Sequence, residues 1–195
     1  MLSGLILSAG ASSRMKGRIK ALLPLKGKTF LDTIIAHMRR LPLSEIVVIL
    51  GAHADKVKEE ADLKGISVLV NDNWSAGQLS SLRTGIRNLS DSSEGILFTL
   101  VDHPLVREET YRVLIEVWQK DKSRIVLPSF NCRKGHPAVF PKDVCDIILK
   151  EELREGARTV LTAMKERVLY VTVDDPGVVR DVDTPEDYIK LEESA

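Results

Sequence analysis

The sequence predicts a doubly wound α/β fold, in which a mostly parallel sheet lies between two layers of helices. Short, continuously apolar segments alternate with amphipathic segments along most of the chain, and none of the apolar segments is long enough to be a core helix. Continuous apolar character is typical of strands that are buried on both faces. Strand–helix–strand alternation at this spacing predicts parallel strands joined by right-handed crossovers.

Five apolar segments are the expected strands of this sheet: residues 5–7, 46–50, 68–70, 96–101 and 125–127. Amphipathic segments lie between them. Residues 30–39 place Phe30, Ile34 and Met38 on one helical face, and residues 110–120 repeat this spacing. Both segments are therefore predicted to be helices that pack on the sheet.

The pattern changes after Pro128. Residues 138–140 form a short apolar segment, residues 144–149 and 160–164 are expected helices, residues 168–173 an expected strand, and residues 185–191 a closing helix with Pro185 in its first turn. We find no internal repeat, linker or low-complexity segment. We therefore expect a single domain over residues 1–195, with less regular strands in its last third.

The composition excludes several classes of protein. The 28 Lys and Arg residues are balanced by 28 Asp and Glu residues, whereas nucleic-acid-binding proteins usually have a basic excess. No apolar run approaches the roughly 20 residues that span a bilayer, and the first residues lack the basic start of a secretory signal. Two cysteines, Cys132 and Cys145, cannot build a disulfide framework or a four-thiolate metal site. We expect a cytoplasmic protein with no nucleic-acid or membrane partner.

The segment after the first strand is a candidate phosphate-binding turn. Small residues follow the strand from Ser8 to Ser13, and ligands of open α/β sheets bind beyond the carboxyl ends of strands. Small side chains let backbone N–H groups approach an anion, and Arg14 and Lys20 add positive charge suited to a polyphosphate. A plain β–α turn with surface lysines is the alternative. The chain lacks the G-x-G-x-x-G and P-loop signatures, which disfavours dehydrogenases, kinases and GTPases.

Two oppositely charged segments occur within the neutral total. Residues 14–28 include six basic and no acidic residues, and residues 174–193 include eight acidic and two basic residues. Two solvated faces of different sign would explain both segments. The basic segment, however, directly follows the expected strand and turn, which favours a role in binding phosphate.

Five motifs resemble, in the expected order, those of the MobA-like nucleotidyltransferases. L-S-A-G-A-S-S-R-M at residues 7–15, followed by Lys20, is similar to L-x-A-G-x-S-x-R-M-G-x-x-K, although Lys16 precedes Gly17 and lengthens the loop by one residue. Residues 71–85, 100–106, 134–137 and 181–187 resemble N-x-x-W-x-x-G-M-x-x-S-L-x-x-G, L-x-D-Q-P-L-V, R-G-H-P and D-I-D-T-P-E-D. Gln78 stands where Met is common, and His103 replaces Gln. The pattern is most similar to the MocA branch, the molybdenum cofactor cytidylyltransferases.

The resemblance implies a three-layer, Rossmann-like sheet of the nucleotide-diphospho-sugar transferase type. It also implies magnesium-dependent transfer of CMP from CTP to molybdopterin with release of pyrophosphate, and a molybdoenzyme or its chaperone as a partner. Three alternatives stay open: another NTP such as GTP, another phosphorylated acceptor such as a sugar or alditol phosphate, and a non-catalytic accessory protein that binds a nucleotide or cofactor.

The resemblance further implies roles for individual residues. The catalytic residues would be Arg14, Lys20 and Asp102, of which the two cations neutralise the triphosphate and the leaving pyrophosphate. The nucleotide-binding residues would be Ser8, Ala9, Gly10, Ser12, Arg14, Lys20, Gly77, Ser80 and Ser81. His103 and His136 would bind the acceptor. Mg²⁺ would be held by Asp102 and Asp183, with Asp181 as the competitor of Asp183, and by substrate phosphates and waters.

Several of these residues also have structural interpretations. Asp102 precedes His103-Pro104 and could form a turn, Asp183 or Thr184 could cap the helix that Pro185 opens, and Ser80 or Ser81 could cap the helical run that follows them. Trp74 is expected to pack in the core or to form a wall of the pocket, and Trp118 is expected in the core. His37 and His53 belong to no motif and are expected to be structural or exposed.

Overall fold

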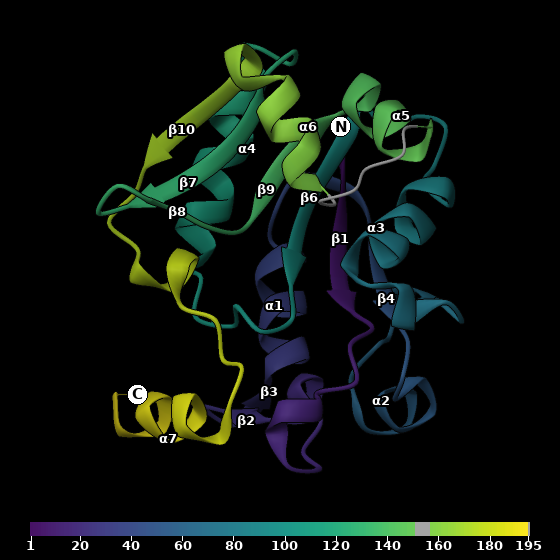
Figure 1. The fold of residues 1–195 in the computed structure, drawn as a ribbon, viewed down its shortest axis with the longest axis vertical. Helices are drawn as coiled ribbons and strands as arrows, with labels where there is room; N and C mark the ends of the chain where they lie inside the picture. Colours follow the sequence, from purple (N-terminus) through teal and green to yellow (C-terminus); the bar gives the residue numbers. More distant parts are fainter. Residues whose placement is uncertain (151–156, 195) are drawn as a thin grey trace.

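The computed structural model describes residues 1–150 and 157–194, and it shows one central sheet flanked by helices (Figure 1). The described strands follow the order β10 (Val168–Thr172), β7 (Ile125–Phe130), β9 (Ala138–Pro141), β6 (Gly95–Leu100), β1 (Leu2–Ser8), β4 (Leu43–Leu50) and β5 (Ser67–Val70), with β8 (Arg133–Lys134) also paired with β7. β1 pairs in parallel with both β4 and β6, and β10 pairs in parallel with β7. β9 is antiparallel to β6 and to β7, so the sheet is mixed but mostly parallel, as predicted.

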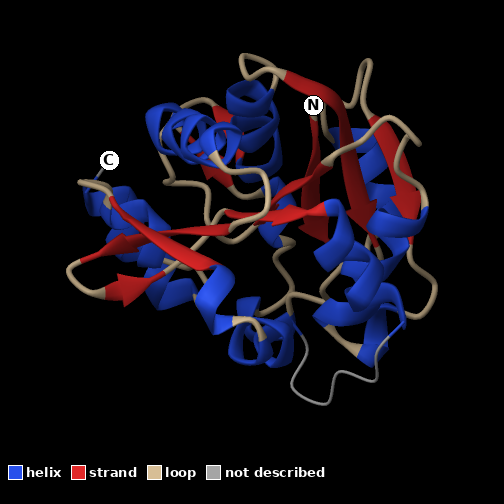
Figure 2. Cartoon of the chain, turned by 90° about the horizontal axis from the view of Figure 1, so that it is seen from above, coloured by secondary structure: helices blue, strands red, loops and turns tan. Residues whose placement is uncertain are grey.

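Helices cover both faces of the sheet (Figure 2). They are α1 (Phe30–Met38), α2 (Ala54–Glu60), α3 (Gln78–Arg87), α4 (Glu108–Lys120), α5 (Lys142–Lys150), α6 (Ala157–Ala163) and α7 (Pro185–Ser194). A small hairpin of β2 (Pro24–Leu25) and β3 (Lys28–Thr29) precedes α1. The expected strands and helices are all present, with ends that differ by a few residues. Short α2 and the hairpin have weak periodic signals and were not predicted.

Two hydrophobic cores lie on opposite faces of the sheet. In β1, Leu2 and Ile6 belong to the core that includes α1, α4 and α7, whereas Leu5 and Leu7 belong to the core that includes α3, α5 and α6. This alternation follows from the two-residue period of a strand. Trp118 is buried in the first core, as predicted. The segments that follow the carboxyl ends of β1, β4 and β6 carry the candidate site.

The chain returns to this edge of the sheet after β10. The turn η5 (Pro176–Val179) leads into a segment whose Val182 N–H donates to the carbonyl oxygen of Asp102 at 2.9 Å. α7 then lies beside the β2–β3 hairpin (Figure 1), where the Tyr188 hydroxyl donates to the Pro24 carbonyl oxygen at 3.0 Å. The hairpin near the start of the sequence and the last helix therefore lie side by side at this edge of the sheet. In the described part of the chain, no helix is long and apolar enough to cross a membrane.

Candidate active site

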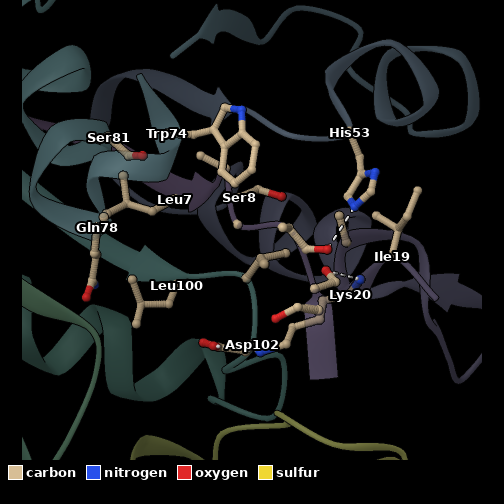
Figure 3. A pocket seen from close by; sticks show the side chains of 18 of the residues that line it. Leu7, Ser8, Ile19, Lys20, His53, Trp74, Gln78, Ser81, Leu100 and Asp102 are labelled. Carbon is tan, nitrogen blue, oxygen red and sulfur yellow. Dashed lines mark hydrogen bonds and ion pairs between the residues drawn. The ribbon is translucent and has the colours of Figure 1, made fainter. Parts of the chain in front are cut away.

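A cavity of about 380 Å³ opens at the carboxyl ends of β1 and β6 (Figure 3). The residues lining it are Leu7, Ser8, Ala9, Gly10, Ala11, Ser12, Ser13, Arg14, Ile19, Lys20, Ala21, His53, Trp74, Ser75, Gly77, Gln78, Ser81, Leu100, Val101 and Asp102. Ser8 Oγ is buried and has no hydrogen-bond partner among the described residues. A polar atom in this state favours a ligand that completes its hydrogen bonding.

The turn after β1 is built to accommodate its extra residue. Ser12 adopts a left-handed conformation (φ 52°), and its Oγ accepts a hydrogen bond from the backbone N–H of Lys20 at 3.1 Å. Lys16 and Gly17 are also left-handed, with φ of 51° and 86°. The side chain of Met15 is buried in the core that includes α1 and holds the loop in place. The backbone thus absorbs Lys16 in two consecutive left-handed residues, and Lys20 still begins the short helical turn η2 (Lys20–Leu22) at the cavity.

The ammonium of Lys20 lies between two carboxylates. Lys20 Nζ is 3.3 Å from Asp102 Oδ2 and also contacts Asp183 Oδ1, while Arg14 contacts the second oxygen of Asp183. The side chain of Lys20 is 13% exposed and each carboxylate is 21% exposed. Asp102 lies mostly buried, because Lys20 and the returning C-terminal segment cover it.

Asp102 keeps its negative charge in this environment. Burial by itself raises the pKa of Asp102, but the hydrogen bond and charge of His103, together with those of Lys20, outweigh burial and hold this pKa below its ordinary value. His103 Nδ1 is 2.9 Å from Asp102 Oδ1, so the two oxygens of Asp102 have different partners. A charged carboxylate oriented in this way can ligate a cation.

The helix that Pro185 opens is capped by Thr184, which leaves Asp183 available. Thr184 Oγ1 accepts from the backbone N–H of Asp187 at 3.2 Å, and Thr184 N–H donates to Asp187 Oδ2 at 2.9 Å. This reciprocal pairing satisfies the first turn of α7. Asp183 reaches Lys20, whereas its competitor Asp181 is exposed.

The donor set formed by Asp102 and Asp183 fits Mg²⁺. Two hard carboxylate oxygens converge on one positive charge, and this hard cation is usually bound by one or two carboxylates completed by phosphates and waters. Over residues 1–150 and 157–194 no cluster of three or more His, Cys, Asp or Glu side chains could enclose a metal alone. A divalent ion at this place would therefore need ligands from a substrate.

His103 and His136 adjoin Asp102 but do not line the cavity. Their rings meet edge to face with centroids 5.1 Å apart, and the ring of Phe98 lies 5.4 Å from that of His136. Burial, with a smaller effect from the charge of His103, lowers the pKa of His136 to about 4. His136 Nδ1 is buried and has no hydrogen-bond partner in the described ranges. His136 is therefore neutral at physiological pH.

Comparison with known proteins shows the family of this chain. The family model of the MobA-like NTP transferase domain matches residues 4–168. The chain belongs to the MobA-like NTP transferase family. It is therefore an enzyme of the nucleotidyltransferase type, and its fold matches solved nucleotide-diphospho-sugar transferase structures, as the sequence predicts.

Two curated relatives of this MobA-like enzyme match nearly its whole length. Nicotine blue oxidoreductase of Paenarthrobacter nicotinovorans is 30% identical over 201 residues, which cover 97% of this chain and 96% of the relative. The molybdenum cofactor cytidylyltransferase of Escherichia coli is 27% identical over 195 residues, with 97% and 94% covered. The Rv0371c protein of Mycobacterium tuberculosis superimposes with a TM-score of 0.85 at 28% identity, with 100% of both chains covered, and it has also been solved in complex with manganese. These relatives do not separate the MocA branch from the rest of the family.

Eight of the nine residues that the sequence analysis assigned to the nucleotide line the cavity; Ser80 does not. Ser80 Oγ lies 2.9 Å from the Asn73 carbonyl oxygen and 2.8 Å from that of Gly77, and it accepts from Asn71 Nδ2 at 2.8 Å. Ser80 therefore holds the loop before α3. The expectation that Ser80 or Ser81 caps this helix was wrong, because α3 begins at Gln78 with Gly77 as its N-cap. Gly77 has φ 95°, which favours glycine.

His53 and Gln78 are among the cavity residues to which the sequence analysis gave no role, whereas Trp74 was expected to pack in the core or to form a wall of the pocket. His53 Nε2 lies 2.9 Å from the Ala11 carbonyl oxygen, which joins the β4–α2 loop to the candidate phosphate-binding turn. Trp74 and His53 lie across the cavity from Asp102 (Figure 3). Trp74 both packs on the second core and forms a wall of the cavity. His53 has no motif around it, so only the fold reveals its position.

Proposed function

We propose that this enzyme transfers CMP from CTP to molybdopterin in a magnesium-dependent reaction that releases pyrophosphate. The observation that carries this proposal is the meeting of Lys20, Asp102 and Asp183 beside a cavity lined by the backbone of the first turn. One place thus offers positive charge for a triphosphate and two carboxylates for a divalent ion. The five motifs and the 27% identity to the Escherichia coli cytidylyltransferase support CTP and molybdopterin as the substrates.

In the proposed reaction, an oxygen of the acceptor phosphate forms a bond to the α-phosphorus of CTP. The bond between this phosphorus and the oxygen that bridges to the β-phosphorus breaks, and pyrophosphate leaves. The acceptor phosphate is already ionised at neutral pH, so no general base is needed. Catalysis consists of in-line positioning and of charge stabilisation.

The residues of the chain divide this work. Arg14 and Lys20 hold the triphosphate and neutralise the charge that develops on pyrophosphate. The backbone of Ala9, Gly10 and Ser12 follows the phosphates, with Ser8 Oγ as a further donor. Gly77 and Ser81 lie toward the base. Mg²⁺ held by Asp102 and Asp183 would supply further charge neutralisation around the transferred phosphate.

The acceptor is assigned to the side of Asp102 that carries the two histidines. His103 contacts Asp102 directly and His136 contacts His103, so a phosphate approaching from this side would meet ring nitrogens close to the reacting centre. His136 Nδ1, which has no partner among the described residues, is available to such a group. In this proposal the chain acts as a single-domain cytoplasmic enzyme that supplies a molybdoenzyme or its chaperone.

The test is pyrophosphate release with CTP, GTP, ATP or UTP and Mg²⁺, with and without molybdopterin. We expect release only when CTP, Mg²⁺ and molybdopterin are present together. Asp102→Asn should lower kcat at least ~100-fold, equivalent to about 2.7 kcal/mol of transition-state stabilisation, because it removes the charge while keeping the shape. Its circular dichroism spectrum should match that of the wild type. Pyrophosphate release with a sugar or alditol phosphate would show that this compound, and not molybdopterin, is the acceptor. Nucleotide binding without any pyrophosphate release would favour a non-catalytic accessory protein.

The 30% identity to nicotine blue oxidoreductase favours a second candidate function, that of an oxidoreductase acting on nicotine blue. The missing glycine fingerprint argues against it, and the cluster of Lys20 with two carboxylates has no evident use in hydride transfer. The two functions are distinguished by incubating the enzyme with NADH or NADPH and nicotine blue and following the nicotinamide absorbance. We expect no oxidation; multiple turnovers together with no pyrophosphate release would establish the second function.

A further inference from the structure

The position of Lys20 leads to an inference about the order in which the site is filled. Lys20 Nζ contacts Asp102 Oδ2 and Asp183 Oδ1, the two oxygens that the proposed function gives to Mg²⁺. The three side chains are at most 21% exposed. Water therefore screens their charges less than it would at an open surface, and their interactions are correspondingly strong.

Backbone hydrogen bonds fix the ends of this cluster. The N–H of Lys20 donates to Ser12 Oγ at 3.1 Å, and the N–H of Val182 donates to the Asp102 carbonyl oxygen at 2.9 Å, which places Asp183 beside Asp102. The ammonium itself stands at the end of a flexible four-carbon chain. It can leave the carboxylates without any movement of the backbone.

A divalent cation and the ammonium cannot share these oxygens. A metal ligated by Asp102 Oδ2 and Asp183 Oδ1 would stand about 2 Å from each, in the space where Lys20 Nζ now lies. Positive charges this close repel each other strongly in a partly buried site. Metal binding must therefore displace Lys20, and displacement is unfavourable unless another anion accepts the ammonium.

We propose that Lys20 is an internal counter-ion that closes the carboxylate pair to divalent cations until a polyphosphate draws the ammonium away. The proposal rests on the proposed function only for the identity of that anion, the triphosphate of an NTP. Metal binding and triphosphate binding then strengthen each other. The triphosphate accepts the ammonium that the metal displaces, and the metal takes the place of the ammonium between the carboxylates.

Arg14 provides a matched control for this proposal. It also carries one positive charge and contacts Asp183, but its side chain is 67% exposed and it approaches the outer oxygen of that carboxylate. Removing Arg14 changes the net charge of the site by the same amount as removing Lys20. It does not empty the space between the two carboxylates.

The test measures Mn²⁺ binding without nucleotide, from the electron paramagnetic resonance signal of free Mn²⁺. We expect Lys20→Met to bind Mn²⁺ at least about tenfold more tightly than the wild type, and Arg14→Met to differ from the wild type by less than about threefold. The double variant Lys20→Met, Asp183→Asn should lose the gain. Equal affinities of Lys20→Met and the wild type would overturn the proposal, and so would equal gains in Lys20→Met and Arg14→Met, since net charge alone would then explain them.

A second measurement covers the case in which Lys20→Met does not fold. In the wild-type protein with ¹⁵N-labelled lysine, the Nζ resonance of Lys20 should shift when CTP is added in the presence of EDTA, and should stay unchanged when Mg²⁺ is added alone. A shift with Mg²⁺ alone, or none with CTP, contradicts the proposal. Neither measurement requires turnover, so an inactive protein with the expected metal affinities would refute the proposed function and leave this inference standing.

Discussion

At the scale of single residues, the charged groups of the site compensate one another before any substrate binds. The sequence analysis assigned Arg14 and Lys20 to phosphate and Asp102 and Asp183 to metal, as two separate sets. In the structure the two sets contact each other directly. Removing one member of a buried ion pair lowers stability by far more than the intact pair contributes, because the remaining charge is left buried without a partner. The four charged side chains therefore depend on one another, and the effect of replacing one of them includes its effect on the other three.

His136 gives a prediction about pH at the same scale. Its pKa is about 4 in the folded protein and near 6.5 in an unfolded chain. Between these values the unfolded chain binds the additional proton, so the free energy of unfolding decreases as the pH falls through this window. Within this pH window, titration of one such group changes the free energy of unfolding by about 1.4 kcal/mol per pH unit. Below pH 4 it causes no further change.

The measurement is urea denaturation of the wild type and of His136→Asn at several pH values from 7 to 4. Other groups, including His37, whose pKa burial also lowers, contribute to both proteins. The difference between the two curves isolates His136. We expect the free energy of unfolding to depend less steeply on pH in the variant, and parallel curves would show that His136 does not remain neutral in the folded protein.

At the scale of elements, the N-terminus of α4 is capped by a residue from a distant part of the chain. Arg107, its N-cap residue, makes no side-chain cap, and its N–H donates to Asp175 Oδ2 at 2.9 Å. Thr110 Oγ1 donates to the same oxygen at 2.6 Å, and Gly177 N–H donates to Asp175 Oδ1 at 2.9 Å. Asp175 is 2% exposed. This one carboxylate therefore joins the C-terminal segment to α4.

We expect Asp175→Ala to lower the free energy of unfolding by about 3 kcal/mol, because it leaves several buried donors without an acceptor. Asp174→Ala is the matched control: Asp174 is exposed, and its backbone oxygen, which accepts from Arg107, is retained. It should change the free energy by no more than about 0.5 kcal/mol. Chemical denaturation gives both values, and similar losses in the two variants would show that the hydrogen bonds of Asp175 are not decisive.

At the scale of the whole molecule, the two charged segments of the sequence face each other. The basic segment after β1 and the acidic segment at the C-terminus meet through the ion pairs of Asp183, and the Arg18 guanidinium lies 5.7 Å from the ring centroid of Tyr188. The outer pair, Lys16 with Glu186 at 3.8 Å, is exposed and contributes little. The interpretation of these segments as two independent solvated faces was therefore wrong.

The return of the C-terminal segment depends on Gly135. A Cβ at this position would stand 1.8 Å from the Val178 carbonyl oxygen, the same oxygen that accepts from the His136 N–H at 2.9 Å. We expect Gly135→Ala to lower the free energy of unfolding by about 3 kcal/mol, because backbone must move to relieve the overlap. Activity should fall as well, since the displaced segment carries Asp183.

Gly10→Ala is the control for Gly135→Ala. Apart from Gly10 and its two chain neighbours, no atom of the described residues lies within 4 Å of a Cβ at Gly10, so we expect a change of at most about 0.5 kcal/mol in the free energy of unfolding. Nucleotide binding should nevertheless weaken, because the methyl group projects from the cavity lining. Thermal melting and CTP titration separate the two effects. Equal melting temperatures for Gly135→Ala and the wild type would show that the contact with Val178 can relax.

The sequence by itself determined the parallel strands, most of the helices, the turn of small residues after β1 and the carboxylate at the end of β6. These features depend on residues close together in the chain: apolar runs, three- and four-residue spacings, and small residues directly after a strand. Only the tertiary structure decided that Asp183 rather than Asp181 reaches Lys20, that Ser80 supports a loop, that His53 enters the cavity, and that β9 runs antiparallel between β6 and β7. The physical reason is that these outcomes depend on where the chain returns in space, through contacts such as Val182 with Asp102, and no local pattern records such a contact.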